Sequence, residues 1–276
     1  MNWKNLGLSY IEKADYLSAQ EYARRTSELA EKLHDQRATA WSLCIFGNID
    51  FRMARYDEAL KTFEKARKIL TTEVQDESLL EEILSFIAAI NINQGNNRGA
   101  YQLIQQAISI AKRLNHPRML SRFLGDAGAI FYYQGNFDKA LEYYEESVRT
   151  SEKIHEQRYA SKSLFNMSIA ANELGKHQEA LQYLLSALPK SIAIEDKHGI
   201  LLTEEELGST YMYLGQYDEA FHHLNKVLGE IDEKDDYHHS AVFYYLGRLK
   251  LLQGNYQPSI ISIRQRTSVS AQTNMT

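Results

Sequence analysis

Apolar residues recur three and four positions apart along most of the chain, and this pattern itself repeats about every 40 residues. Spacings of three and four are the period of an amphipathic helix, whereas half-buried strands alternate polar and apolar residues. Three stretches superimpose without gaps: QGNFDKALEYY (134–144), LGKHQEALQYL (174–184) and LGQYDEAFHHL (214–224). Four weaker copies keep the same period, so the pattern predicts an all-α protein built from similar helical units.

Three series of residues mark each unit and predict how its helices meet. A small residue closes each copy at spacings of 39 to 41 residues: Ala19, Ala59, Ala100, Ala140, Ala180, Ala220 and Ser259. A second series, expected where two helix backbones approach closely, is Gly7, Gly47, Ala88, Gly128, Ser168, Gly208 and Gly247. Between them stand Ala14, Ala54, Gly95, Gly135, Gly175, Gly215 and Gly254, which we expect to end the first helix of each unit in a left-handed conformation.

These marks carry a resemblance to a known family. Two units match the signature of the tetratricopeptide repeat residue by residue, through Trp3, Leu6, Gly7, Tyr10, Ala14, Tyr16 and Ala19, and through Leu207, Gly208, Tyr211, Gly215, Tyr217 and Ala220. The resemblance implies an α-solenoid of about seven helix–turn–helix repeats that forms a right-handed superhelix, with the first helices lining its concave face. The period exceeds the usual 34 residues, so we expect longer helices, and this form resembles repeat arrays of bacterial signalling proteins.

The resemblance covers one continuous array. We expect the array to span residues 1–266, with repeats at about 1–39, 40–80, 81–120, 121–160, 161–200, 201–239 and 240–266, and a polar tail at 267–276.

Composition supports helices and narrows the class of partner. Only three prolines and five valines occur among 276 residues, and this scarcity of valine, a residue enriched in strands, disfavours a large sheet. The formal net charge of −5 disfavours a direct nucleic-acid binder, which needs a basic face. The N-terminal segment has no signal-peptide pattern, no stretch is apolar enough to span a membrane, and Cys44 stands alone. A cytoplasmic protein with no membrane contact is the expectation.

The sequence offers little catalytic chemistry. It lacks a phosphate-binding loop, a dinucleotide fingerprint, a nucleophile elbow and the HExxH and CxxC metal motifs. Cys44 lies within a predicted helix without a periodic acid or base partner, which favours an inert thiol. We therefore expect no enzyme, no cofactor and no metal site.

Two groups of polar residues receive structural interpretations. His34, His116, His155 and His198 each fall in a turn between repeats, where a histidine can cap the free carbonyls of a helix end. Glu204, Glu205 and Glu206 follow Thr203 near the expected start of a helix, where the helix dipole stabilises acids. Glu204 nevertheless occupies a position where other repeats carry leucine, and a partner contact there is an open alternative.

Distance along the helix from the second small-residue series, Gly7 to Gly247, selects residues expected on the concave face. The candidates for binding a peptide or protein are Asn48, Arg52, Arg122, Tyr132, Tyr133, Lys162, Asn172, Tyr213 and Arg248. Amides can hold the backbone of an extended segment and aromatic rings its side chains. Packing in the repeat interior is the alternative for each aromatic residue.

We therefore expect a non-enzymatic scaffold that binds a protein or peptide segment in the concave groove, in bacterial signalling or regulation. The alternative is the sensory part of a signalling enzyme, such as a cyclase or kinase, or of a transcription regulator whose output domain is absent from this chain.

Overall fold

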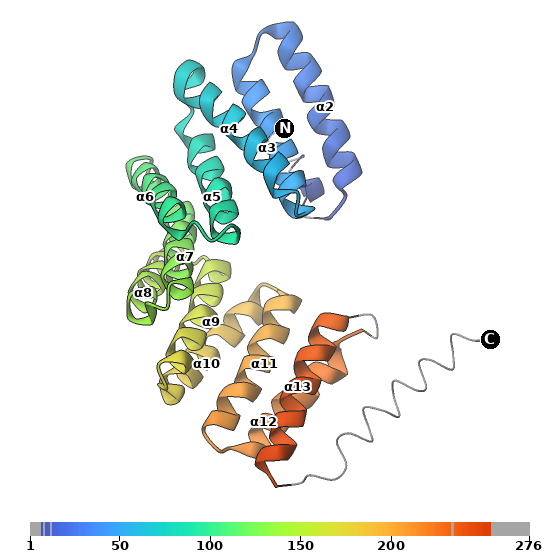
Figure 1. The fold of residues 1–276 in the computed structure, drawn as a ribbon, viewed down its shortest axis with the longest axis vertical. Coiled ribbons are helices and arrows are strands. Elements are labelled where there is room, and N and C mark those ends of the chain that lie inside the picture. The colour runs from blue at the N-terminus through green and yellow to red at the C-terminus, as the bar shows by residue number, and fades with distance from the viewer. Residues whose placement is uncertain (1–6, 8, 12, 233–234, 255–276) are drawn as a thin grey trace, which may run out of the picture. The chain divides into compact units, whose positions relative to one another are not determined.

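The computed structural model describes residues 7, 9–11, 13–232 and 235–254, and every element within them is helical. The chain divides into two compact units, Met1–Glu156 (unit 1) and Gln157–Thr276 (unit 2). Unit 1 contains α2 (Tyr16–Leu33), α3 (Gln36–Arg52), α4 (Tyr56–Ile69), the short π-helix η1 (Leu70–Val74), α5 (Glu77–Asn93), α6 (Asn97–Arg113), α7 (Pro117–Tyr133) and α8 (Phe137–Lys153). Unit 2 contains α9 (Gln157–Glu173), α10 (His177–Ala193), α11 (Lys197–Tyr213), α12 (Tyr217–Glu230) and α13 (Asp236–Leu252). The expected all-α fold is confirmed (Figure 1).

Consecutive helices form antiparallel pairs joined by tight turns, as the sequence predicts. Each predicted turn residue has a positive φ, from 55° at Ala14 and 57° at Ala54 to between 72° and 77° at the five glycines. This left-handed conformation ends the first helix of a pair, and glycine adopts it without strain because it has no Cβ. The structure thus confirms the helix–turn–helix unit.

The two small-residue series lie at the contacts within each pair. The alanines at positions 19, 59, 100, 140, 180 and 220 are fully buried. A Cβ added at Gly128 would lie 2.6 Å from the Tyr144 ring, and one at Gly208 would lie 2.7 Å from Leu224 Cγ. Close approach of the two helices therefore requires glycine at these positions, which confirms the prediction.

Within each unit the first helices of successive pairs also contact one another directly. In unit 1, α3 contacts α5 and α5 contacts α7; in unit 2, α9 contacts α11 and α11 contacts α13. In the described part of the chain, no pair of second helices makes comparable contacts. The first-helix side of each unit is therefore the more tightly packed side, and we call it the inner face of that unit.

The capping role predicted for the turn histidines is wrong for His116 and His198, because their rings contact side chains of other helices. His116 directs its Nδ1 atom to Glu81 Oε1 at 2.9 Å, and His198 lies inside the first turn of α11 and contacts His238. At His34 and His155 it is the backbone, with φ of 51° and 55°, that forms the turn. The rings of His116 and His198 thus link helices of neighbouring repeats.

Cys44 is fully buried in α3, in keeping with an inert thiol. Within the described ranges, no helix is both long and apolar enough to cross a bilayer. The second helix expected for the seventh repeat and the tail at 267–276 lie outside the described residues, so these boundaries stay predictions.

Candidate functional site

Asn172, on α9, is the centre of a polar network on the inner face of unit 2. Its Nδ2 group donates to Glu206 Oε1 and to Thr210 Oγ1 of α11, both at 2.8 Å. Its Oδ1 atom lies 3.0 Å from Nδ1 of His177, the first residue of α10. The amide thus joins three helices.

Tyr213 and Arg248 continue this network along the inner face. The His177 ring stacks on Tyr213 with centroids 4.6 Å apart and planes 5° apart. The Arg248 guanidinium, from α13, lies 5.7 Å from the ring centroids of both Tyr213 and Tyr244. Three predicted binding residues, Asn172, Tyr213 and Arg248, therefore belong to one cluster carried by α9, α11 and α13. Lys162, the fourth in unit 2, is exposed on α9.

The position predicted for the three glutamates is wrong. Glu204, Glu205 and Glu206 lie in the middle of α11, which begins at Lys197, and not in its first turn. Successive helical residues point in different directions, so each carboxylate meets a different helix. Glu204 contacts His223 and Lys226 of α12, both at 2.6 Å, Glu205 contacts His238 of α13 at 2.6 Å, and Glu206 contacts α9.

The surroundings shift the pKa of each carboxyl differently. Burial disfavours the ion at Glu204, but hydrogen bonds from His223 and Lys226 outweigh it and lower the pKa. Burial raises the pKa of Glu205 despite the bond from His238. At Glu206 burial raises the pKa to about 7, and only the Asn172 amide opposes that shift. Glu206 can therefore exchange a proton near neutral pH.

Arg122, on α7, organises a second cluster on the inner face of unit 1. Its Nη2 group donates to Ser85 Oγ of α5 at 3.1 Å, and its guanidinium carbon lies 5.6 Å from the Phe86 ring centroid. Phe86 stacks on Phe63 with centroids 5.1 Å apart. The aromatic base holds Arg122 half-buried on this face, where its remaining N–H groups can donate to a carbonyl or carboxylate.

The other candidates in unit 1 differ in accessibility. Tyr132 and Tyr133 form an edge-to-face pair at the end of α7, and Tyr133 is 65% exposed. Arg52 is exposed at the end of α3. Asn48 is only 4% exposed, and its Oδ1 atom has no hydrogen-bond partner among the described residues. A contact through Asn48 therefore requires a ligand group that reaches into the helix layer.

Each cluster combines amide, hydroxyl or guanidinium groups with aromatic rings, the combination that holds an extended backbone and its side chains. The sequence analysis did not select Glu206 or His177 as site residues. The signal available in the sequence was the acidic run itself, whose first member, Glu204, stands where other repeats have Leu43, Leu84, Leu124 and Leu164.

Comparisons with known proteins identify the family. A family model described as Tetratricopeptide repeat matches residues 1–72, 79–153 and 119–190, and a second model with the same description matches residues 205–233. The chain belongs to the tetratricopeptide repeat family. Comparison with curated protein sequences gave no match.

Solved tetratricopeptide repeat structures share this fold at low sequence identity. A signal transduction ATPase (STAND protein) with a tetratricopeptide repeat sensor, from Pyrococcus horikoshii, has a TM-score of 0.77 and 13% identity over 95% of this chain and 40% of that chain. The apo form of RapI has a TM-score of 0.75 and 15% identity over 95% of this chain and 74% of that chain. The apo form of the quorum sensor NprR from B. thuringiensis has a TM-score of 0.69 and 15% identity over 88% of this chain and 68% of that chain.

Proposed function

We propose that this tetratricopeptide repeat chain is a non-catalytic scaffold that binds an extended protein or peptide segment on the inner faces of its units. The observation that carries the proposal is the contiguous cluster of Asn172, Tyr213 and Arg248 on three successive first helices of unit 2. An amide, an aromatic ring and a guanidinium arranged in this way offer hydrogen bonds to a backbone and a flat surface for a side chain.

A role in bacterial signalling or regulation fits the comparisons. Two of the similar structures are named for signal transduction and for quorum sensing, and each contains a fold similar to that of this chain. We infer that the chain likewise acts by binding a partner, with Arg52, Arg122 and Arg248 favouring acidic or carbonyl-rich segments.

A binding titration tests this function. A peptide selected from a random display library against the full chain is titrated by calorimetry against Tyr213→Ala and Arg248→Gln. Loss of a central aromatic or arginine contact should weaken binding by about tenfold or more. Gln182→Ala, an exposed change on the second helix α10, is the matched control and should leave affinity unchanged.

Unit 1 has its own test with the same peptide. Tyr132→Ala/Tyr133→Ala should weaken binding if the segment reaches α7, whereas Glu142→Ala, exposed on α8, should not. Unchanged affinity in folded variants of both units would contradict binding on the inner faces. Equal losses in variants and controls would instead indicate unfolding.

A second function is favoured by one observation: the chain covers 40% of a protein whose repeats are named as its sensor. In that case the array senses a segment and transmits binding to an output domain encoded next to it. The gene sequence beyond codon 276 tests this alternative, because it either encodes an output domain or does not.

A further inference from the structure

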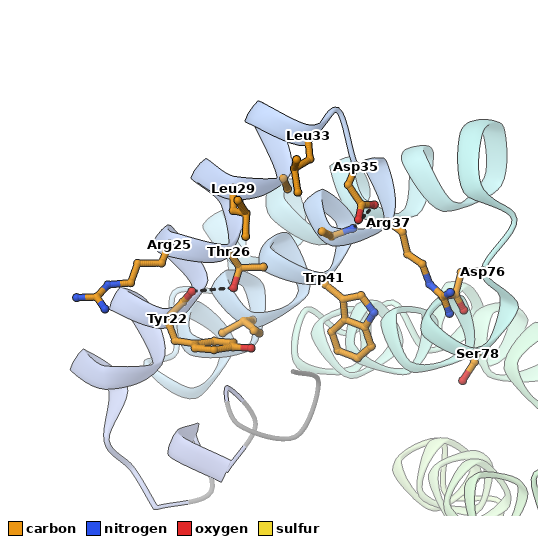
Figure 2. A pocket seen from close by; sticks show the side chains of 13 residues that line it. Tyr22, Arg25, Thr26, Leu29, Leu33, Asp35, Arg37, Trp41, Asp76 and Ser78 are labelled. Atoms are coloured by element: carbon orange, nitrogen blue, oxygen red, sulfur yellow. Dashed lines mark hydrogen bonds and ion pairs between the residues drawn. The ribbon is translucent and has the colours of Figure 1, made fainter. Parts of the chain in front are cut away.

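The charged side chains around the pocket between α2 and α3 of unit 1 are engaged within that unit (Figure 2). Arg37 donates from Nε to Asp76 Oδ2 at 2.7 Å, and Arg25 donates from Nε to Glu21 Oε1 at 2.7 Å. Asp35 caps the N-terminus of α3. The inner face of unit 2 differs, because it holds an acid that has no basic partner.

That acid is Glu206, in the middle of α11. The carboxylates of its neighbours Glu204 and Glu205 each bond to basic side chains of another helix. Glu206 instead accepts a hydrogen bond from the neutral amide of Asn172, through Oε1 at 2.8 Å. Among the described residues, its Oε2 atom accepts no hydrogen bond and its carboxylate forms no ion pair. One half-buried negative charge on this face is therefore uncompensated.

The acidic groups around Glu206 increase the local negative charge. Glu173 of α9 and Glu205 of α11 both oppose its ionisation, after burial itself. From α13, Tyr245 presents a neutral phenol: burial first, and the Glu206 carboxylate next, raise the pKa of Tyr245 to about 12. A cation arriving at Glu206 would meet a negative potential.

The basic side chains of the neighbouring helices are engaged elsewhere. The Nδ1 atom of His177, from α10, lies 3.0 Å from the amide oxygen of Asn172. On α12, His223 and Lys226 bond to the neighbouring carboxylate Glu204. The Arg248 guanidinium, from α13, lies over two tyrosine rings. In the described part of unit 2, none of these groups neutralises Glu206.

The equivalent acid of unit 1 has a cation of its own. Asp126 of α7 and Glu206 of α11 both stand two residues before the small residue of their repeat. Arg122 precedes Asp126 by four residues, and its Nε atom lies 3.9 Å from Asp126 Oδ2. The matching residue of α11 is Leu202, which carries no charge. The repeat of Glu206 thus lacks the cation that the repeat of Asp126 supplies.

We propose that the segment bound on the inner face of unit 2 carries a lysine or arginine side chain whose charged head pairs with Glu206. A half-buried carboxylate without a counter-ion is unfavourable, and a cation from a ligand relieves that cost. Tyr213 and Tyr244, 49% and 61% exposed on the same face, can pack against the alkyl stem of such a side chain. The proposal rests on the binding function above and specifies the chemistry of its partner.

Peptides selected against the full chain at pH 8 are the probe. We expect peptides from a random display library to share a lysine or arginine at one position. Norleucine or citrulline, the uncharged analogues of these residues, should weaken binding to the wild type by about tenfold when placed there. The same replacement should have no effect on binding to Glu206→Gln, because the charge that it pairs with is already absent.

Two further variants sharpen this comparison. Glu179→Gln removes the same charge at an exposed position of the second helix α10, so it is the matched control and should keep the tenfold effect. Leu202→Arg places a cation four residues before Glu206, as Arg122 stands before Asp126, and should weaken the unmodified peptide by competing for the carboxylate.

Binding should also depend on pH in the direction that Glu206 sets. With a pKa of about 7, its carboxyl is largely protonated at pH 6 and largely ionised at pH 8. The basic peptide pairs with the ionised form, so the wild type should bind it about tenfold more weakly at pH 6 than at pH 8. Glu206→Gln should lose most of this difference. A full difference in that variant would assign it to His177 and contradict the proposal.

Two other results would overturn the proposal: selected peptides that share no basic residue, and equal losses with the uncharged analogue in the wild type and in Glu206→Gln. The broader binding function stands in either case if Tyr213→Ala still weakens the selected peptide. It falls together with this proposal if Tyr213→Ala and Glu206→Gln both bind the peptide as the wild type does.

Discussion

At the scale of single residues, two kinds of position govern the repeat: those where no side chain fits and those where a polar group is buried. Gly128 belongs to the first kind, since its Cα faces the Tyr144 ring, and Ala140 is fully buried beside the same helix contact. The 40-residue period alone predicts both positions, because the equivalent contact recurs in successive repeats. Glu204 and Glu205 belong to the second kind, and Glu206 beside them is half-buried.

Gly128→Leu should lower the free energy of unfolding by about 1–3 kcal/mol, because a branched side chain must displace the Tyr144 ring. Ala140→Asp should cost at least as much, since it buries a charge without a partner. Urea denaturation followed by circular dichroism measures both. Gly229→Ala is the control: an added Cβ meets no atom within 4 Å there, so stability should be unchanged or slightly higher. Wild-type stability in both core variants would contradict the predicted contacts.

Glu206 should make the stability of the protein depend on pH near neutrality. Its pKa is about 7 in the folded chain, above the ordinary value of 4.5, so the folded state holds the proton more tightly than the unfolded state. The Glu206 contribution to stability therefore falls as the pH rises through this interval.

Glu206→Gln keeps an acceptor for Asn172 and removes the ionisation. Relative to the wild type, the variant should gain on the order of 2 kcal/mol at pH 8 and nothing at pH 4.5. Thermal melts of the two proteins across this range measure the difference. An equal offset at both pH values would contradict a pKa near 7 and indicate a purely steric effect.

The polar residues show where sequence reasoning at this scale stops. Asn172, Tyr213 and Arg248 are selected by their position along the helix alone, because successive first helices of unit 2 turn the same positions toward its inner face. The contacts of Glu206 depend on which side chains of neighbouring repeats meet. Packing between repeats decides this, and the helical period carries no information about it.

At the scale of elements, the turns set the geometry of each helix pair. Five of the seven turn positions carry glycine, whereas Ala14 and Ala54 adopt the same left-handed conformation with a Cβ. The sequence predicts these turns correctly because the residue that ends a helix in this way is locally determined. It misplaces Glu204, Glu205 and Glu206 because the start of α11, at Lys197, lies further upstream than the acidic run indicates.

Replacement of a turn residue should change stability in opposite directions at two sites. Ala54→Gly removes the strain of a φ of 57° and should stabilise the protein by about 0.5–1 kcal/mol. Gly135→Ala imposes that strain at a φ of 73°, with no atom within 4 Å of the new Cβ, and should destabilise by about 1 kcal/mol. Chemical denaturation of the pair measures both signs. A loss of stability in Ala54→Gly would show that chain entropy outweighs the strain.

At the scale of the whole molecule, the repeat makes the described part of the chain almost entirely helical. Far-UV circular dichroism should therefore report more than about two thirds helix, well above the roughly one-third average of globular proteins. A spectrum with a substantial sheet contribution would contradict the fold.

The central claim is that the inner faces of the units bind an extended segment, and hydrogen–deuterium exchange tests it most directly. The chain is measured alone and saturated with the library-selected peptide. We predict slower exchange in the first helices α9, α11 and α13, around Asn172, Tyr213 and Arg248, and unchanged exchange in α12 and in α10 beyond its first turn, where His177 contacts the cluster. Protection confined to α10 and α12 would contradict the claim, because the segment would then lie on the opposite side of unit 2.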